Sequence, residues 1–233
     1  MAITVLLATR NAKKLVELQR IINGFVGSSA DIAVVTLDQV ASYPEPVESG
    51  ATFAENALIK AAEGASRTGL PTLADDSGLC VEALYGAPGV FSARWAGRHG
   101  DDQANLELLL AQLRDVPDSR RTAAFVCAAA LVVPAAGGKQ EDDPRNAGAG
   151  SAGTGSGGTD VEAVQHGRLT GELIRVPRGM GGFGYDPIFV PAGQQQTTAE
   201  LTAEEKDAIS HRGQAFRALM PNLAALVSSV AHN

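Results

Sequence analysis

The sequence predicts an α/β fold, because apolar strand-like runs alternate along the chain with segments of helical periodicity. Residues 3–8 and 31–36 are predicted strands, and residues 122–133, which are nearly all apolar, are predicted to form the central strand of the sheet. At 233 residues, the chain is long enough for one good-sized α/β domain or for two lobes that share a sheet.

Composition and charge narrow the class of protein. Hydrophobic residues make up 45% of the chain and charged residues 19%, which is typical of an ordered globular protein. The 19 basic and 26 acidic residues give a net charge of −7, which argues against a general nucleic-acid surface but not against a small anionic ligand. Cys80 and Cys127 lie in apolar runs, as reduced core cysteines do, and the apolar start of the chain is too short for a signal or a membrane span. We therefore expect a cytoplasmic protein.

Helices are predicted after residue 11 and from Asp101, and two more begin at capping boxes. One box is Thr52-Phe53-Ala54-Glu55, whose helix should run to about residue 68, and the other is Thr202-Ala203-Glu204-Glu205. Residues 134–160 are rich in glycine, alanine and serine, and we interpret them as a flexible insertion between two paired strands.

Two adjacent carboxylates, Asp75 and Asp76, follow an apolar run. Ser77-Gly78 is predicted to be the turn that ends this strand, so the carboxylates are expected at a strand end, where open α/β sheets place ligand clefts. No basic partner is obvious beside them, and a divalent cation such as Mg²⁺ would relieve their mutual repulsion. An ordinary turn with solvated charges explains the same residues.

A strand, a polar turn and a helix at the start of the chain are suited to binding phosphate. The backbone N–H groups and the positive end of the helix dipole face the turn, and Thr9, Asn11, Lys13 and Lys14 add further donors. The alternative is a capped turn with solvated lysines. In the helix that begins at the Thr52 capping box, Asn56 and Lys60 share a face and are interpreted as a solvated pair, with a position facing a cleft as the alternative.

The segment 179–184 matches G-x-G-x-x-G, but a strand follows it instead of a helix, so we reject a dinucleotide-binding fingerprint. Flexible glycines beside Phe183 and Tyr185 are better suited to a loop that brings an aromatic ring over a flat ligand. In the last segment, Lys206 and the pair His211-Arg212 cannot share one face of a straight helix, so they converge only if the chain bends near Ser210.

Six motifs occur in series along nearly the whole chain outside 134–160. They are Thr9-x-Asn11-x-x-Lys14-x-x-Glu17, Thr52 to Ala57, Asp75 to Leu79, Gly86 to Gly89 followed by Ser92-Ala93-Arg94, Gly182 to Pro187, and Ser210 to Gly213. With them the chain resembles the inosine/xanthosine triphosphate pyrophosphatase family. The resemblance implies a single domain over 1–233, with a long mixed β-sheet dividing two α/β lobes around an active-site cleft. Arg10 departs from the family, which often has Gly or Ser there, and the glycine-rich insertion is extra.

The implied activity is Mg²⁺-dependent hydrolysis of aberrant purine nucleoside triphosphates (ITP, dITP and XTP) to the monophosphate and pyrophosphate. Asp76 would be the catalytic carboxylate, which binds Mg²⁺ and handles the attacking water, with Glu48 as a second metal ligand and Asp75 in support. The substrate would be bound by the residues that match the family's motifs: Thr9, Arg10, Asn11, Ala12, Lys13, Lys14, Ser77, Phe183, Gly184, Tyr185, Asp186, Lys206, His211 and Arg212.

Within that set, Thr9 to Lys14 would hold the phosphates and Phe183 would stack on the purine. Asp186, His211 and Arg212 would contact the edge of the base, assisted by Lys206. Donors such as Arg212 pair with a 6-oxo group, whereas the 6-amino group of adenine would leave them unpaired, at a large cost in rate. A homodimer is also implied, with no nucleic-acid or membrane partner.

The sequence is also compatible with two alternative functions. A Maf-type pyrophosphatase acting on pyrimidine nucleotides shares the opening turn but is not expected to carry Ser210-His211-Arg212-Gly213. A nucleotide-binding sensor without turnover is the other, and the presence of Asp76, Lys14 and Glu48 counts against it.

Overall fold

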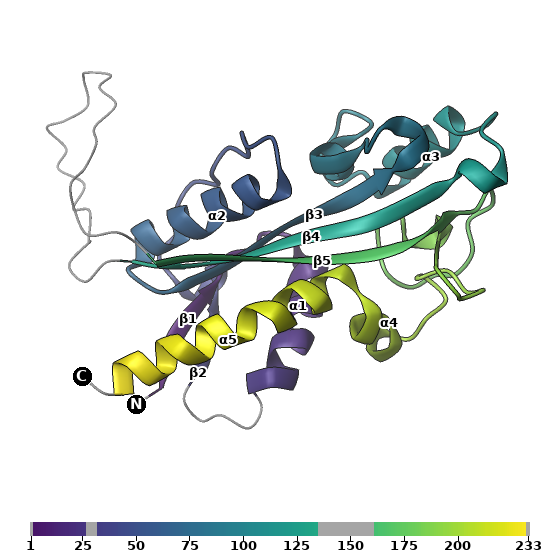
Figure 1. Ribbon diagram of the computed structural model, residues 1–233. Coiled ribbons are helices and arrows are strands. Elements are labelled where there is room, and N and C mark those ends of the chain that lie inside the picture. Colours follow the sequence, from purple (N-terminus) through teal and green to yellow (C-terminus); the bar gives the residue numbers. More distant parts are fainter. Residues whose placement is uncertain (1, 27–31, 135–160, 232–233) are drawn as a thin grey trace, which may run out of the picture.

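A six-stranded mixed sheet forms the centre of the computed structural model, which describes residues 2–26, 32–134 and 161–231 (Figure 1). The strand order is β2-β1-β3-β4-β5-β6. Strand β1 (Ile3–Leu7) is parallel to β2 (Ile32–Thr36) and to β3 (Thr72–Val81), whereas β3, β4 (Thr122–Val133), β5 (Val161–Leu173) and β6 (Phe189–Pro191) are successively antiparallel. The predicted α/β class with a long mixed sheet is confirmed. The glycine-rich insertion lies, but for Pro134, outside the described residues.

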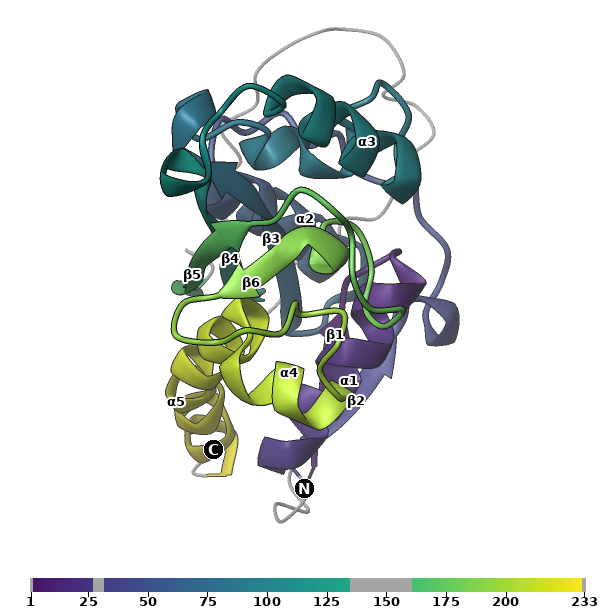
Figure 2. The same cartoon turned by 90° about the vertical axis from the view of Figure 1, so that its right-hand side faces the viewer.

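Helices cover both faces of the sheet. On one face lie α2 (Phe53–Thr68) and, farther along, α3 (Asp102–Gln112); on the other lie α1 (Ala12–Val26), α4 (Ala203–Ile209) and α5 (His211–Ala231), as Figures 1 and 2 show. The connections within the described residues contain five short 3₁₀ helices: η1 (Leu37–Gln39), η2 (Glu82–Leu84), η3 (Gly89–Arg94), η4 (Asp118–Arg120) and η5 (Asp186–Ile188). None of the helices in the described part of the chain is long and apolar enough to cross a membrane.

Strand β4 is the predicted central strand, and both of its faces are buried. Cys127, Ala129 and Leu131 belong to the core that includes α5, whereas Ala128 and Ala130 belong to the core that includes α2. The facing residues of α2 are also alanines, so helix and sheet approach each other closely.

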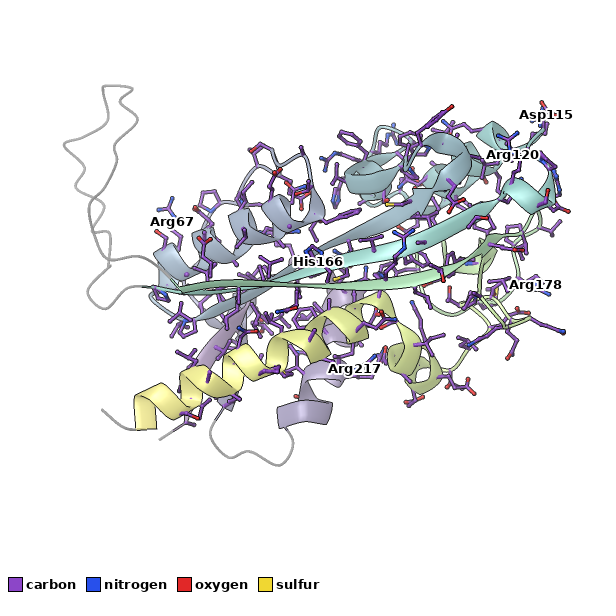
Figure 3. The ribbon with its side chains drawn as sticks, viewed as in Figure 1. Arg67, Asp115, Arg120, His166, Arg178 and Arg217 are labelled. Carbon is purple, nitrogen blue, oxygen red and sulfur yellow. The ribbon has the colours of Figure 1, made fainter. Side chains whose placement is uncertain are left out.

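Both cysteines of the chain are free thiols, with Cys127 buried and Cys80 partly exposed. Charged side chains such as Asp115 and Arg120 lie at the outer surface (Figure 3).

The predicted turn at Ser77-Gly78 is wrong, because β3 continues through both residues to Val81. What ends near the carboxylates is β1, which pairs with β3 only at residues 72 and 73 before its chain turns away into α1. Gly78 is required for another reason: a Cβ there would lie 2.4 Å from the carbonyl oxygen of Gly89 and from Ser92 Oγ. A glycine in the strand therefore allows η3 to pack directly against it.

The predicted bend between the last two helices is confirmed. Ser210 has an extended backbone (φ −62°, ψ 148°) and separates α4 from α5. Both capping boxes form, with Thr52 and Thr202 each accepting the N–H of the glutamate three residues later. The extended residue turns Lys206 and the pair His211-Arg212 toward the same side of the sheet.

Candidate active site

Two neighbouring cavities open beside the middle of β3, at the end of β1. The larger has a volume of about 330 Å³ and the smaller about 80 Å³. The larger is lined by Thr9, Arg10, Asn11, Lys14, Tyr43, Glu45, Glu48, Lys60, Asp75, Asp76 and Ser77, among others. The smaller is lined by Asn11, Lys14, Ser77, Asn105, Phe125, Phe183, Gly184, Tyr185, Asp186, His211 and Arg212, among others. Because Asn11, Lys14 and Ser77 line both, the cavities adjoin.

Asp75 and Asp76 point to opposite faces of the sheet, since successive side chains of a strand alternate. Asp75 faces α1 and α5, and Asp76 faces α2. Each carboxylate has its own basic partner, so the expectation that they repel each other without one is wrong. These two ion pairs could not be predicted from the residues around Asp75 and Asp76, because Lys14 and Lys60 lie on helices that are distant from β3 in the sequence.

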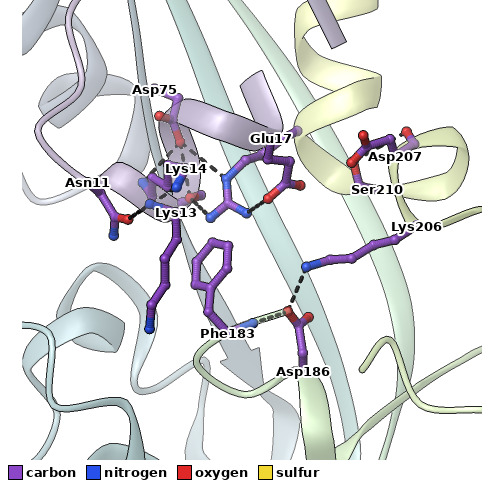
Figure 4. A network of polar contacts seen from close by, with 12 residues as sticks. Asn11, Lys13, Lys14, Glu17, Asp75, Phe183, Asp186, Lys206, Asp207 and Ser210 are labelled. Atoms are coloured by element: carbon purple, nitrogen blue, oxygen red, sulfur yellow. Dashed lines mark hydrogen bonds and ion pairs between the residues drawn. The ribbon is translucent and has the colours of Figure 1, made fainter. Parts of the chain in front are cut away.

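Asp75 is the more strongly paired of the two carboxylates, and Figure 4 shows Lys14 beside it. Its Oδ2 lies 3.0 Å from Lys14 Nζ and 3.6 Å from Arg212 Nε, and it accepts a hydrogen bond from Ser77 Oγ at 3.2 Å. Burial alone would raise the pKa of Asp75, but the charges of Lys14, Arg212 and Lys60 outweigh it and hold that pKa below the ordinary value. Asp75 is therefore ionised and orders the cations around it.

Asp76 lies among residues of α2. Its Oδ1 is 3.1 Å from Lys60 Nζ, and its Oδ2 accepts a hydrogen bond from Asn56 Nδ2 at 3.3 Å. The interpretation of Asn56 and Lys60 as a solvated pair is wrong, because Asn56 is fully buried and the Lys60 side chain is 14% exposed. The alternative holds for Lys60, which lines the larger cavity. Burial raises the pKa of Asp76, and the charges of Lys60 and Lys14 offset this only in part, while Glu48 adds to it. A carboxylate with a raised pKa is a better proton acceptor.

Glu48 is joined to Asp76 through Lys60, whose Nζ is 3.1 Å from Glu48 Oε1. Arg94 Nη1 is 3.3 Å from the other oxygen of Glu48. Burial opposes ionisation of Glu48, but Lys60 and Arg94 lower its pKa below the ordinary value. Neither Asn56, Lys60 nor Arg94 was among the predicted site residues, although the one-turn spacing of Asn56 and Lys60 was visible in the sequence.

The residues present fit a magnesium ion. Within the described residues, no three His, Cys, Asp or Glu side chains form a metal cluster. Mg²⁺ commonly needs only one or two protein carboxylates, with waters and substrate phosphates as its other ligands. Glu48 and Asp76 supply two hard oxygen donors on either side of one ammonium group. Burial raises the pKa of Asp76 more than Lys60 and Lys14 lower it, so a further cation at this carboxylate would stabilise its ionised form.

The turn from Thr9 to Lys14 carries donors to both cavities. Asn11 Oδ1 accepts the backbone N–H groups of Lys13 and Lys14 at 3.0 and 3.1 Å and so fixes the start of α1. This directs Lys14 to Asp75, whereas Lys13 Nζ reaches Asp102 at the start of α3, 2.6 Å away. Ala12 and Lys13 line neither cavity.

Phe183 lies between cationic side chains at the smaller cavity (Figure 4). Lys206 Nζ and Arg212 Cζ are each 5.1 Å from its ring centroid, and Lys13 Nζ is 5.9 Å away. Asp186 fixes the loop, because it accepts the N–H of Phe183 at 2.8 Å and binds Lys206 Nζ at 2.6 Å. Lys206 lines neither cavity and reaches the site through Asp186.

His211 and Arg212 come from the first turn of α5. Arg212 binds Glu17 at 3.0 Å and donates to Ser77 Oγ at 2.9 Å. The His211 ring stacks on Phe125, with centroids 5.0 Å apart, and burial together with Arg212 and Lys206 lowers its pKa well below the ordinary value. Its two ring nitrogens are buried and accept or donate no hydrogen bond within the described part of the chain. An imidazole with two unpaired ring nitrogens is therefore among the residues that line the smaller cavity.

Tyr185 has a structural contact, since its hydroxyl donates to the carbonyl oxygen of Ser92 at 2.9 Å. Glu17 belongs to the first motif but was given no role from the sequence, and the structure places it, buried, against Arg212. Together these contacts join the turn after β1, the middle of β3, the 183–186 loop and the start of α5 into one polar network.

Comparison with known proteins identifies the family of the chain. The Ham1 family model matches residues 5–222. A dITP/XTP pyrophosphatase from Nocardia farcinica is 55% identical over 222 residues, which is 95% of each chain, and one from Streptomyces coelicolor is 53% identical over 93% of this chain and 94% of its own.

Solved structures show the same likeness. The crystal structure of a nucleoside-triphosphatase / dITP/XTP pyrophosphatase from Mycobacterium abscessus is 52% identical to this chain, with a TM-score of 0.67 over 95% of this chain and 100% of that one. A HAM1 protein from Coxiella burnetii is 40% identical, with a TM-score of 0.74 over 96% of this chain and 99% of that one. The chain belongs to the Ham1 family.

Proposed function

We propose that this protein hydrolyses aberrant purine nucleoside triphosphates, with ITP, dITP and XTP as its substrates, to the monophosphate and pyrophosphate in the presence of Mg²⁺. The names of its relatives indicate a nucleoside-triphosphate pyrophosphatase. The observation that carries the proposal is the pair of adjoining cavities, one lined by cations and carboxylates and the other by aromatic rings and buried donors.

The larger cavity suits the triphosphate. Lys14 and Lys60 line this cavity and supply two ammonium groups for phosphate oxygens. Glu48 and Asp76 would hold Mg²⁺, which supplies charge neutralisation on the phosphates when it is bound. Asp76, with its raised pKa, orients the attacking water and accepts its proton.

The smaller cavity suits a 6-oxo purine. Phe183 offers a ring face for stacking, Arg212 is a donor for the oxo group, and the neutral His211 has free nitrogens for the base edge. Adenine would place its amino group against the Arg212 donors and leave them unpaired, which disfavours ATP.

The family resemblance also implies a homodimer, and the exposed Tyr85 and Phe91 offer apolar surface for it. Light scattering, which measures the molecular mass in solution, tests whether the protein is a dimer.

The test is pyrophosphate release from ITP, dITP, XTP, ATP, GTP, dTTP and UTP, each with Mg²⁺ and with a chelator. We expect the three 6-oxo substrates named in the proposal to be preferred over ATP, and turnover to disappear with the chelator. Preference for dTTP or UTP would assign the protein to pyrimidine nucleotides, and tight binding of ITP without pyrophosphate release would make it a sensor.

A further inference from the structure

The junction between the two cavities is marked by the residues that line both of them: Asn11, Lys14, Ser77, Ala93, His99 and Gly100. The first three belong to the turn after β1, to α1 and to β3, and the other three belong to the segment that runs from η3 to α3. A nucleotide with its base in the smaller cavity and its phosphate chain in the larger would have its sugar and its first phosphate at this junction. The side chains here therefore decide what the middle of such a ligand contacts.

His99 differs from the other polar side chains at the junction. Asn11 Oδ1 accepts two backbone N–H groups at the start of α1, Lys14 Nζ is 3.0 Å from a carboxylate, and Ser77 Oγ has hydrogen bonds with two side chains. The exposed imidazole of His99 makes no hydrogen bond, ion pair or ring contact within the described residues. A neutral imidazole has one N–H donor and a protonated one has two, so in either state His99 has a donor for a ligand.

The polar side chains nearest to His99 in the sequence are committed to contacts within the protein. Ser92 Oγ accepts a backbone N–H group of β3 at 2.9 Å, and Asn105 Oδ1 accepts one just after η3 at 2.7 Å. Asp102 forms an ion pair with Lys13 at 2.6 Å. All three line the smaller cavity, but their polar groups already have partners. In this segment, His99 is therefore the side chain most readily given to a ligand.

A short loop fixes where His99 lies. Gly97 and Gly100 flank Arg98-His99 and have φ values of 90° and 80°, a left-handed conformation that glycine adopts without strain. The N–H of Gly100 donates to the carbonyl oxygen of Ala93 at 2.8 Å, which closes the loop onto η3. Backbone contacts thus hold His99 at the junction, and its side chain needs no contact of its own to stay there.

We propose that His99 binds the phosphate attached to the nucleoside, which is the α-phosphate of a triphosphate and the phosphate of the product monophosphate. This inference rests on the proposed function, since it takes the base to lie in the smaller cavity and the phosphate chain in the larger. Lys14 lines the same junction, so a phosphate there meets an ammonium group as well as the imidazole donor.

Phosphate is the better partner of the two groups expected at the junction. A sugar hydroxyl is neutral, whereas a phosphate oxygen carries charge, and a hydrogen bond to a charged acceptor is roughly twice as strong as one between neutral groups. His99 then adds affinity for the monophosphate part of the substrate. It adds none for the nucleoside alone or for the pyrophosphate that leaves.

The experiment measures the binding of three probes to the full-length protein with Mg²⁺: inosine monophosphate (IMP), inosine and inorganic pyrophosphate. Calorimetric titration serves for IMP and pyrophosphate, and a proton NMR titration, which reaches weak affinities, serves for inosine. The variants are His99→Ala and His99→Gln, with Arg98→Ala as the matched control. Arg98 is the exposed basic neighbour in the same loop, and it lines neither cavity.

We expect His99→Ala to weaken IMP binding about tenfold, the scale of one lost hydrogen bond to a charged group, with inosine and pyrophosphate binding within about twofold of wild type. His99→Gln should lose less, since its amide keeps an N–H donor. Arg98→Ala should bind all three probes like wild type.

Four results would overturn the proposal. Unchanged IMP binding in His99→Ala would mean that no contact is made, and equal losses for IMP and inosine would mean a contact with the sugar or base, or a displaced loop. A loss for pyrophosphate as large as that for IMP would place His99 at the leaving phosphates, and an equal loss of IMP binding in Arg98→Ala would assign the effect to the charge of the loop. Wild-type protein that releases pyrophosphate from ITP in these cases retains the proposed function, whereas wild type that neither turns over ITP nor binds IMP contradicts both proposals.

Discussion

Replacing Asp76 with asparagine tests the proposed catalytic role, because the change keeps the shape of the side chain and removes its charge and basicity. We expect kcat for ITP to fall by about two to four orders of magnitude, the usual contribution of a positioned general base. Nucleotide affinity should change much less, since Lys14, Phe183 and Arg212 reach the cavities without contacting Asp76.

The effect on stability follows from the direction of the pKa shift. The pKa of Asp76 is raised by burial, so its ionised form is disfavoured in the folded protein, and any stability that its protonated form provides is lost as pH rises through that pKa. At neutral pH the neutral asparagine therefore should not lower the melting temperature. Lys60 keeps Glu48 as a partner at 3.1 Å, so the substitution leaves no isolated cation.

Asp75→Asn is the matched control, because it makes the same change one residue away on the other face of the strand. The pKa of Asp75 is lowered by Lys14, Arg212 and Lys60, so its charge contributes stability at pH values above about 4 that is lost as pH falls. Removing one partner of a buried ion pair costs roughly 3 kcal/mol, or about 6–12 °C in Tm for a chain of this size.

The assay is pyrophosphate release from ITP with Mg²⁺, alongside Tm measured without metal near neutral pH. Near-normal turnover in a stably folded Asp76→Asn protein would refute the catalytic assignment. A large fall in Tm for Asp76→Asn, with Asp75→Asn unchanged, would show that the two carboxylates have the opposite roles to those argued from their contacts.

Three further predictions concern the residues around them. Arg212→Ala should narrow the preference for ITP over ATP and lower Tm, since Glu17 loses its buried partner; unchanged discrimination in steady-state kinetics would place Arg212 away from the base. Lys60→Met should raise the pKa of Asp76 further, because its nearest positive charge is removed, and a pH profile of kcat/KM should show the acidic limb moved to higher pH. The pKa of His211 is lower in the folded protein than the value of about 6.5 in the unfolded chain, so stability is highest above pH 6.5. As the pH falls below 6.5, the free energy of unfolding decreases by up to about 1.4 kcal/mol per pH unit. The Tm of His211→Gln should therefore depend less on pH below pH 6.5 than that of wild type, and identical pH profiles of Tm would contradict the buried neutral ring.

The sequence determined the elements whose signals are local. A near-continuous apolar run identified β4 as central, because a strand buried on both faces has no polar positions. The capping boxes at Thr52 and Thr202 marked the starts of α2 and α4, since each box is completed within four residues. The geometric conflict between Lys206 and His211-Arg212 on one straight helix indicates the bend at Ser210 from the sequence alone.

Only the tertiary structure decided how the charges pair. Asp75 and Asp76 are neighbours in the sequence whether their segment forms a turn or a strand. The segment is a strand because it pairs with a distant one, in which Ala129 and Ala128 of β4 lie opposite the two carboxylates. That pairing sends the two carboxylates to opposite faces, where Lys14 and Lys60 arrive from different helices. A local sequence window contains neither the partner strand nor the partner cations, so it identified the chemical groups of the site but not which of them neutralise one another.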